Sequence, residues 1–403
     1  MAERIVIVGA GQAGASLAEA LRTGGHDGPI ALIGEEAAPP YQRPPLSKKY
    51  LLGEMDAERL WLKPDAFWTE HDIELITGAP VAAIDRDARA VRLADGRAVA
   101  YDKLALTTGA RPRLLPPAMG GDLAGVYPVR TLADVDAMAP EFAAGRRALI
   151  VGGGYIGLEA AAVAAARGLR VTLIEAAPRI LQRVAAAETA DFFRALHASH
   201  GVEIREGVGL ERLEGEGRAT GATLSDGARV AADFALVGIG VTPNAELAEA
   251  AGLSVENGIA VDAFGATDDP AIFAAGDCAS FPWRGRRIRL ESVQNAIDQA
   301  KAVAAAMLGR GAPYDPTPWF WSDQYDVKLQ IAGLNAGFDR TVVRPGAREG
   351  TRSVWYFAEG RLIAVDAMND PRAYMTGKRW LEAGVSPDPD RLADPASDFK
   401  TLA

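Results

Sequence analysis

Two stretches of the chain show the same order of hydrophobic and polar positions. Each begins with a short apolar run, at residues 5–8 and 148–151, that passes through a glycine-rich turn into an alanine-rich helical segment. A second β-branched run follows, at residues 30–33 and 171–174. Short apolar runs bounded by glycine are typical of buried strands in a parallel sheet. The pattern therefore predicts strand, turn, helix and strand, in that order, twice.

The two turns carry the same glycine spacing, GAGQAG at residues 9–14 and GGGYIG at residues 152–157. In this motif the first glycine permits a tight turn, the second lets the backbone approach a pyrophosphate, and the third allows close packing of helix on strand. An acid follows each second run, Glu35 in the first copy and Glu175 in the second, where a carboxylate can accept ribose hydroxyls. The two copies predict two dinucleotide sites.

The similarity between the copies extends beyond the glycines. Each has an Asp-Gly hairpin signal downstream, Asp95-Gly96 and Asp226-Gly227, followed by a strand that ends in a Gly-x-x-Pro sequence. A three-stranded β-meander inserted in each copy, with a return to a final parallel strand, explains this order. The alternative is that glycine-rich turns recur by chance, as they do in many α/β proteins. The matched order favours a duplicated domain.

Size and charge narrow the class of protein. A chain of 403 residues exceeds the size at which one core usually stops growing, so we expect two or three domains. The apolar run at 148–166 is long enough to span a bilayer, but its glycines and Glu159 fit a strand, turn and helix better. A strand so near the first residue leaves no room for a targeting segment, which favours a cytoplasmic protein. The net charge of −10 argues against nucleic-acid binding.

The cysteine and histidine content limits the chemistry. Cys278 is the only cysteine, so no disulfide can form within the chain, and we expect a small buried residue and not a nucleophile. His197 and His200 lie one helical turn apart and could share a metal. The simpler interpretation places His200 at the C-terminus of a helix that Gly201 ends. Acid-base catalysis by histidine is not indicated.

Six further segments, spread along the whole chain, carry a resemblance to a known family: PYQRPPLSK from Pro40, TTGARPR from Thr107, GGGYIGLE from Gly152, AAGDC from Ala274, ESVQNA from Glu291 and PWFWSDQY from Pro318. The chain resembles the FAD-dependent, NADH-oxidising ferredoxin reductases of oxygenase systems, of the putidaredoxin reductase and biphenyl dioxygenase type. The resemblance implies an α/β, glutathione-reductase-like fold with two Rossmann-type dinucleotide-binding domains and a C-terminal α+β domain. The expected boundaries are 1–112 with 243–317 for the FAD domain, 113–242 for the NAD domain and 318–403 for the C-terminal domain.

The resemblance also implies which residues bind FAD. They are Gly9, Gly11, Ala13, Gly14, Glu35, Arg43, Lys48, Val81, Arg111, Arg130, Asp277 and Val293. Physical arguments support two of these positions. The Asp277 carboxylate can hydrogen-bond a ribityl chain, and a helix over 293–308 would direct its N-terminal N–H groups toward the flavin. An ordinary turn residue at Asp277 and a solvated lysine at Lys48 are the alternatives.

The expected contacts of the pyridine nucleotide lie in the second copy. They are Gly152, Gly154, Tyr155, Ile156, Gly157, Glu159, Glu175, Arg183 and Gly240. Glu175 favours NADH, because a carboxylate binds the 2′-hydroxyl but repels the extra phosphate of NADPH. Arg179 and Arg183 lie close by in sequence, and arginines there can hold that phosphate instead.

Three residues carry the expected chemistry. The family places Lys48 and Glu159 together near the flavin N5 edge and the nicotinamide, where each holds the other in its charged form. Trp321 matches a family tryptophan on the acceptor side of the flavin, where it lines the electron exit or simply covers the ring. The structural alternatives are an ordinary helix residue at Glu159 and core or interface packing at Trp321.

The expected partner is a small 2Fe–2S ferredoxin that serves a haem-thiolate monooxygenase or a Rieske dioxygenase. The chain has too few cysteines to hold a cluster of its own. The basic run from Arg284 to Arg289 is either a docking patch for this partner or a solvated hairpin. Rubredoxin, a small-molecule acceptor or a redox-controlled binding role are the alternative functions. We expect a monomer or a weak dimer.

Overall fold

The computed structural model describes residues 2–402, and these residues form two compact units. The first unit comprises residues 2–43, 56–111 and 241–316, and the second comprises residues 44–55, 112–240 and 317–402. Each unit is therefore assembled from segments that are distant in sequence. The three-domain boundaries expected from the sequence stay a prediction.

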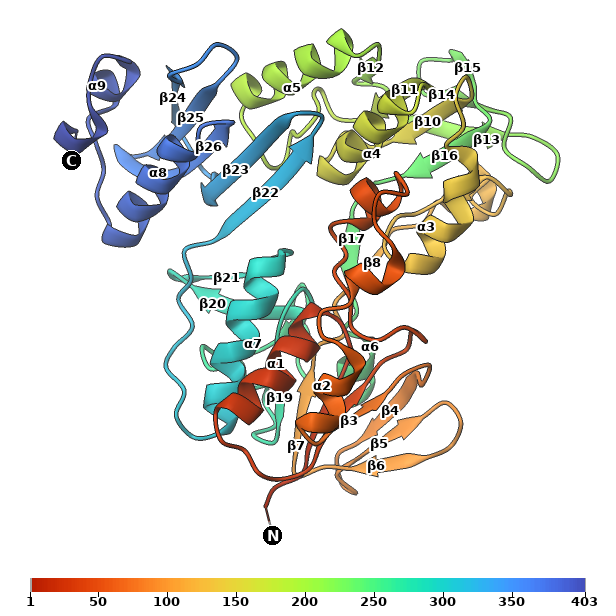
Figure 1. Cartoon of the computed structure of the whole chain (residues 1–403), viewed down its shortest axis with the longest axis vertical. Helices are drawn as coiled ribbons and strands as arrows, with labels where there is room; N and C mark the ends of the chain where they lie inside the picture. The colour runs from red at the N-terminus through yellow and green to blue at the C-terminus, as the bar shows by residue number, and fades with distance from the viewer. Residues whose placement is uncertain (1, 403) are drawn as a thin grey trace. The chain divides into compact units, whose positions relative to one another are not determined.

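The first unit is built on a five-stranded parallel sheet with the order β19-β7-β1-β2-β3. Its strands are β1 (Ile5–Val8), β2 (Ile30–Ile33), β3 (Ile73–Ile76), β7 (Lys103–Leu106) and β19 (Ile272–Ala274). Helices α1 (Gln12–Thr23) and α7 (Val293–Met307) lie side by side and share one hydrophobic core with the sheet (Figure 1). Every residue of β1 is buried, as expected of a central strand covered on both faces.

The rest of the first unit consists of short elements around this sheet. They are the antiparallel meander β4 (Val81–Asp85), β5 (Ala90–Leu93) and β6 (Ala98–Ala100), the small sheet β18 (Ile259–Ala260), β20 (Ala279–Trp283) and β21 (Arg286–Ile288), and the short helices η2 (Ala57–Leu60), α2 (Asp65–Glu70) and α6 (Glu246–Ala250). Strands β8 (Ala110–Pro112) and β17 (Val241–Pro243) pair where the chain leaves and re-enters the unit.

The second unit repeats this plan. Its parallel sheet has the order β12-β11-β10-β16-β9, and its strands are β9 (Val126–Tyr127), β10 (Arg147–Val151), β11 (Arg170–Glu175), β12 (Glu203–Glu206) and β16 (Phe234–Val237). A meander again precedes the return strand, made of β13 (Leu210–Glu214), β14 (Gly221–Leu224) and β15 (Arg229–Ala231). The helices are η1 (Leu46–Tyr50), η3 (Pro117–Met119), α3 (Leu132–Met138), η4 (Ala139–Glu141), α4 (Tyr155–Ala166) and α5 (Ala187–Ser199).

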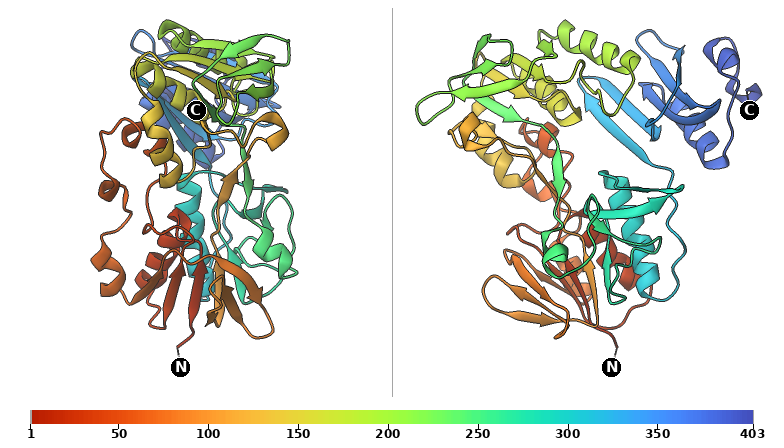
Figure 2. Two further views of the ribbon diagram at one scale, coloured as in Figure 1. Left: turned by 90° about the vertical axis from the view of Figure 1, so that its right-hand side faces the viewer. Right: turned by 180° about the vertical axis from the view of Figure 1, so that it is seen from behind.

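A five-stranded antiparallel sheet completes the second unit, with the order β22-β23-β26-β25-β24. Its elements are β22 (Trp319–Gln324), β23 (Val327–Gly333), β24 (Arg340–Pro345), β25 (Arg352–Ala358), β26 (Arg361–Met368), α8 (Pro371–Ala383), α9 (Pro389–Ala393) and η5 (Phe399–Thr401). Helix α8 packs on this sheet through a core that includes Trp355, Val365 and Trp380 (Figure 2).

The structure confirms the predicted duplication. In both units the first strand pairs in parallel with the strand after the helix and with the strand after the meander: Ile5 lies opposite Ile30 and Lys103, and Ala148 lies opposite Val171 and Phe234. The Asp-Gly turns at 95–96 and 226–227 each join two antiparallel strands of a meander, as expected.

Other expectations from the sequence are also confirmed. The helix expected over 293–308 is α7, and Ser292 caps its N-terminus by accepting from the Asn295 backbone N–H at 3.1 Å. His200 is the C-cap of α5, and Gly201 follows it with φ +78°. Cys278 is buried, and its burial raises the pKa of the thiol. Between residues 2 and 402, no helix combines the length and the apolar character that a membrane crossing requires.

Candidate functional site

The first glycine loop connects β1 to α1, and the structure shows why glycine is needed at two of its positions. Gly9 has φ +112°, and a Cβ there would overlap the Thr107 carbonyl oxygen and lie 2.9 Å from Thr108 N. A Cβ on Gly14 would overlap the Gly9 carbonyl oxygen. Gly11, the N-cap of α1, has nothing within 4 Å of its Cβ position and makes no side-chain cap. The space in front of the N-terminal N–H groups of α1 is therefore open to an anion.

The second loop, between β10 and α4, repeats these features. Gly152 has φ +109°, and a Cβ there would overlap the Gly238 carbonyl oxygen. A Cβ on Gly157 would overlap the Gly152 carbonyl oxygen, whereas Gly154, the N-cap of α4, faces open space. Both loops fit the approach of a dinucleotide pyrophosphate to a helix N-terminus.

The acids that follow the two second strands have different surroundings. Glu175 ends β11, and its carboxylate accepts from the backbone N–H groups of Gly153 and Ala177, both at 2.7 Å. This contact ties the acid to its own glycine loop. Glu35 is exposed, and the next residue, Glu36, accepts from Arg43 at 2.6 Å and from the Tyr41 hydroxyl at 2.5 Å. Glu35 and Arg43 were expected from the sequence, whereas Glu36 was not, although its position beside Glu35 could have indicated it.

The other predicted FAD residues of the first unit lie on several elements. Ala13 is buried in the first turn of α1, Val81 begins β4, Arg111 lies on β8, and Val293 begins α7. Arg111 contacts the Asn244 Oδ1 atom at 2.9 Å and forms an ion pair with Glu246.

Asp277 follows a turn at Gly276, which has φ +83°. A Cβ on Gly276 would lie 2.9 Å from the Ala13 Cβ, so the structure brings this turn next to the first glycine loop. The Gly276 N–H donates to Gln299 Oε1 of α7 at 2.8 Å, which ties the turn to that helix as well.

Lys48 and Glu159 form an ion pair within the second unit, with 3.0 Å between Lys48 Nζ and Glu159 Oε1. Glu159 lies on α4 and is only 6% exposed, while Lys48 lies on η1 with a side chain that is 18% exposed. Burial raises the pKa of Glu159, and the nearby Lys48 charge opposes that rise. Lys48 also lies 3.8 Å from Asp323. The sequence placed the two residues together, and their role toward the cofactors stays a prediction.

The structure adds residues around Glu159 that the sequence reasoning did not identify. Ser47 Oγ donates to Glu159 Oε2 at 3.1 Å, and Ser322 Oγ donates to Oε1 at 2.8 Å. Behind Ser322, Gln324 and His197 continue the hydrogen bonds. The period-two spacing of Ser322 and Gln324 in a strand sequence places both on one face, but nothing in the sequence indicated that this face meets α4.

The remaining predicted residues of the second unit are distributed over several elements and loops. Trp321 is partly exposed on β22, with ring centroids 5.7 Å from Trp319 and 6.3 Å from Phe320. The Arg183 guanidinium lies 3.5 Å from the Cβ position of Gly240, which has φ +100°. Ile156 is exposed in the first turn of α4, and Arg130 precedes α3, where its backbone N–H donates to Asp134.

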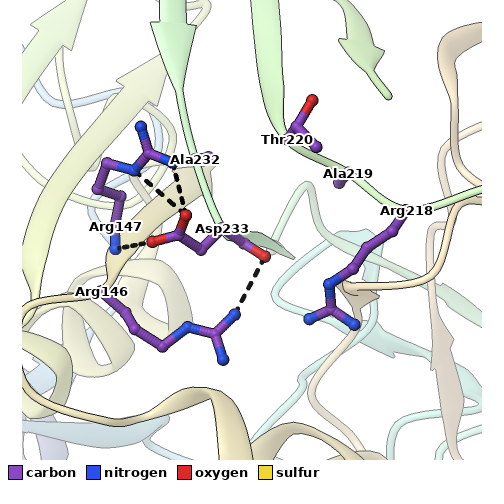
Figure 3. A pocket seen from close by; sticks show the side chains of 7 residues that line it. All are labelled: Arg146, Arg147, Arg218, Ala219, Thr220, Ala232 and Asp233. Atoms are coloured by element: carbon purple, nitrogen blue, oxygen red, sulfur yellow. Dashed lines mark hydrogen bonds and ion pairs between the residues drawn. The ribbon is translucent and has the colours of Figure 1, made fainter. Parts of the chain in front are cut away.

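A cavity of about 320 Å³ lies elsewhere in the second unit and contains none of the predicted residues (Figure 3). It is lined by Arg146, Arg147, Arg218, Ala219, Thr220, Ala232 and Asp233. Arg147 pairs with Asp233 at 2.6 Å, whereas Arg146 and Arg218 both pair with Glu141. Since each guanidinium already has an acidic partner, we assign no ligand to this cavity.

The basic run from Arg284 to Arg289 divides into two kinds of residue. Arg287 donates to the Val261 and Ser280 carbonyl oxygens, and Arg289 donates to the Asp277 carbonyl oxygen and pairs with Glu291. Arg284 and Arg286 are exposed in the β20–β21 hairpin, over the ring of Trp283. Arg287 is exposed as well, but its guanidinium is already bonded to carbonyl oxygens and pairs with Glu256, so Arg284 and Arg286 are the better candidates for contact with a partner.

Comparison with known proteins identifies the family. A family model described as pyridine nucleotide-disulphide oxidoreductase matches residues 3–300, and one described as reductase C-terminal matches residues 319–403. The chain belongs to the pyridine nucleotide-disulphide oxidoreductase family. The resemblance and the fold class expected from the sequence are thus confirmed. The chain is an oxidoreductase that uses FAD and a pyridine nucleotide.

Individual relatives match over nearly their whole length. The chain is 44% identical to rhodocoxin reductase of Rhodococcus erythropolis, over 98% of this chain and 93% of that protein. It is 42% identical to the ferredoxin–NAD(+) reductase component of the anthranilate 1,2-dioxygenase system of Burkholderia cepacia, over 100% and 99%. The reductase in the covalent putidaredoxin reductase–putidaredoxin complex superposes with a TM-score of 0.95 at 41% identity, over 99% and 98%.

Proposed function

We propose that this protein takes a hydride from NADH and passes the electrons singly to a small 2Fe–2S ferredoxin of an oxygenase system, either a haem-thiolate monooxygenase or a Rieske dioxygenase. The observation that carries the proposal is the presence of two complete glycine loops in one chain, together with full-length similarity to proteins named ferredoxin reductases. FAD, when bound, accepts electrons as a pair and releases them one at a time.

The residues of the two loops suit the two nucleotides. The open space at Gly11 and the helix N-terminus of α1 would hold the FAD pyrophosphate, and Asp277 follows the Gly276 turn that lies beside Ala13, where its carboxylate would bind the ribityl chain. Gly154 and the N-terminus of α4 would hold the pyrophosphate of NADH. Glu175 supports NADH over NADPH, because its two backbone hydrogen bonds keep a carboxylate beside the loop, where it repels a 2′-phosphate.

Lys48 and Glu159 position the reacting rings and transfer no proton in this proposal. Their ion pair holds a single charged geometry in a site from which water is largely excluded, and this makes the electrostatic environment rigid. No cysteine pair competes for the electrons, because Cys278 is the only cysteine of the chain, and it is buried. The electrons must therefore leave to a separate acceptor.

The assignment of a ferredoxin as the electron acceptor is supported by the similar proteins. One relative is named a ferredoxin–NAD(+) reductase component, and the other was solved as a complex with putidaredoxin. Arg284 and Arg286 offer exposed positive charge suited to an acidic ferredoxin. The cytoplasmic location and the monomeric or weakly dimeric state expected from the sequence stay predictions.

Rapid-mixing measurement of the two half-reactions tests the proposal. We expect fast reduction of the FAD-loaded protein by NADH and slower reduction by NADPH. We also expect rapid reoxidation by a 2Fe–2S ferredoxin, at a rate that falls as salt is added. Fast reduction without reoxidation by any ferredoxin would contradict the acceptor and leave a small molecule, rubredoxin or a redox-controlled binding role.

A pair of variants tests the part assigned to Trp321. If Trp321 lines the electron exit, Trp321→Phe slows reoxidation by ferredoxin several-fold and leaves reduction by NADH unchanged. Trp319→Phe is the matched control, because Trp319 lies two residues away on the same face of β22. Slower reduction in Trp321→Phe, with normal reoxidation, would show that the indole only covers the ring.

A further inference from the structure

A chain of buried polar side chains leads away from Glu159 through the second unit. It passes from Glu159 on α4 to Ser322 and Gln324 on β22, then to His197 on α5 and Tyr325 just after β22. Ser322, Gln324 and His197 each have 0% relative exposure. Separate elements of the fold therefore contribute to one hydrogen-bonded path, whose three middle members are fully buried and whose last member, Tyr325, is partly exposed.

The donors along this path all point toward the carboxylate. Ser322 Oγ donates to Glu159 Oε1 at 2.8 Å and accepts from Gln324 Nε2 at 3.2 Å. Gln324 Oε1 can only accept, so the proton of His197 resides on Nε2, 2.8 Å away. That leaves His197 Nδ1 as the acceptor for the Tyr325 hydroxyl at 3.3 Å. Aligned donors polarise one another, and the polarisation strengthens the last bond, to the carboxylate.

The charge state of His197 fits this direction. Burial lowers the pKa of His197 to about 4, with the Gln324 hydrogen bond opposing the change, so the ring is neutral at physiological pH. A neutral ring with one N–H can serve as acceptor at one nitrogen and donor at the other, whereas an imidazolium could not accept from Tyr325.

We propose that Ser322, Gln324, His197 and Tyr325 are positioning residues that keep the Glu159 carboxylate ionised and directed at Lys48. The relevance of Glu159 to the reaction rests on the proposed function. The effect of these four residues on the Glu159 carboxylate does not depend on it. If the path served packing alone, apolar side chains of the same shape would fill the space at no electrostatic cost to Glu159.

Other charged and titratable groups also act on the ends of the path. Lys48 on η1 favours the carboxylate form of Glu159, while Asp323 on β22, whose backbone N–H lies 3.4 Å from Glu159 Oε1, brings a second negative charge nearby. At the far end, His200 stacks on the Tyr325 ring at 3.7 Å between centroids. His200 makes its own hydrogen bonds to Ser199 and Leu196 and lies outside the path.

The test is a pH titration of the Glu159 carboxyl band by infrared difference spectroscopy on the FAD-loaded protein. The band is identified by its loss in Glu159→Gln. We expect the midpoint to rise by about one pH unit in Ser322→Ala, which removes a hydrogen bond to a charged acceptor, and to rise less in Gln324→Met and His197→Phe. Midpoints that coincide with that of the unmodified protein in all three variants would overturn the proposal.

Two further variants separate positioning from packing. His197→Gln keeps a donor toward Gln324, so its midpoint should return to within a few tenths of a unit of the unmodified protein. His200→Gln changes a ring that stacks on Tyr325 but makes no hydrogen bond to a member of the path, so it should leave the midpoint unchanged. A rise as large in His200→Gln as in His197→Phe would mean a general loosening of α5 and would overturn the proposal.

The same samples distinguish this proposal from the proposed function. Shifted midpoints together with unchanged pH dependence of reduction by NADH would support the positioning chain and remove Glu159 from the reaction. Unshifted midpoints with normal reduction by NADH would overturn the positioning chain alone.

Discussion

The two units share a nucleotide-binding scaffold but differ in what they bury. In the first unit the buried polar side chains are neutral: Ser16, Thr107, Ser280, Asn295 and Gln299. The second unit buries ionisable groups among the residues that the structure describes: Glu141, Glu159, His197, Arg344 and Asp366. A buried charge requires a partner, so the second unit holds networks that the first does not need.

One pair of equivalent positions shows this difference most clearly. Ser16 lies seven residues after Gly9, and Glu159 lies seven residues after Gly152. Ser16 accepts a hydrogen bond from Gln12 of the same helix at 3.2 Å. Glu159 instead accepts hydrogen bonds from Ser47 and Ser322, which are distant in sequence. The same helix position therefore bonds within its own helix in the first copy, whereas in the second copy it bonds to chain segments that are distant in sequence.

The largest expected effect tests the shared scaffold. Gly14→Ala and Gly157→Ala would each place a methyl group on the carbonyl oxygen of the first glycine, so each should destabilise its unit by about 3 kcal/mol or more. We expect Gly14→Ala to lose FAD on purification. Thermal unfolding and flavin absorbance are the measurements, and an unchanged unfolding temperature in both variants would contradict the steric role of the third glycine.

A second prediction concerns the buried acids of the second unit. Burial raises the pKa of Asp366 to about 6, although Tyr356 and Thr189 donate to its Oδ2 atom. A raised folded-state pKa means that the stabilising contribution is complete below about pH 3.8 and is lost as pH rises through about 6. This loss amounts to about 3 kcal/mol.

Asp366→Asn should therefore remove that pH dependence, and the variant should gain stability relative to the unmodified protein as pH rises from 4 to 7. Scanning calorimetry at several pH values measures the difference. A constant difference across this range would mean that Asp366 keeps an ordinary pKa in the folded protein.

The middle glycines give a smaller effect that separates the two nucleotides. Since a Cβ at Gly11 or Gly154 meets no atom within 4 Å, Gly11→Ala and Gly154→Ala should fold normally. The added methyl would occupy the space in front of the helix N-terminus. We expect Gly154→Ala to weaken NADH binding tenfold or more while FAD is retained, and Gly11→Ala to weaken FAD binding. Equilibrium titration of each ligand checks this, and an equal loss of both ligands in either variant would contradict separate sites.

The smallest expected effect distinguishes the two acids. Glu175→Gln keeps an oxygen for one of the two backbone N–H groups, loses the acceptor for the other, and removes the negative charge, so the preference for NADH over NADPH should fall several-fold. Glu35→Gln is the matched change in the first copy and should leave this preference as it was. Dissociation constants for both nucleotides test the pair, and a changed preference in Glu35→Gln would require a different assignment of the two loops.

Much of the fold and part of the site could be predicted because their signals are local. Glycine spacing, Asp-Gly turns and β-branched runs specify backbone conformation within a few residues, and the loops, the meanders and the turn at Gly276 follow them. The pairing of Glu36 with Arg43 and the hydrogen bonds of Arg287 to the Val261 and Ser280 carbonyl oxygens were missed, since neither depends on a local pattern.

The sequence by itself determined two glycine loops, the order of strands around each, and a single cysteine that excludes internal disulfide chemistry. Only the tertiary structure decided that Ser322, Gln324 and His197 line up behind Glu159. The physical reason is the distance along the chain over which each feature is determined. Backbone conformation follows from neighbouring residues, whereas a buried carboxylate is stabilised by whichever donors the packing of distant elements brings to it.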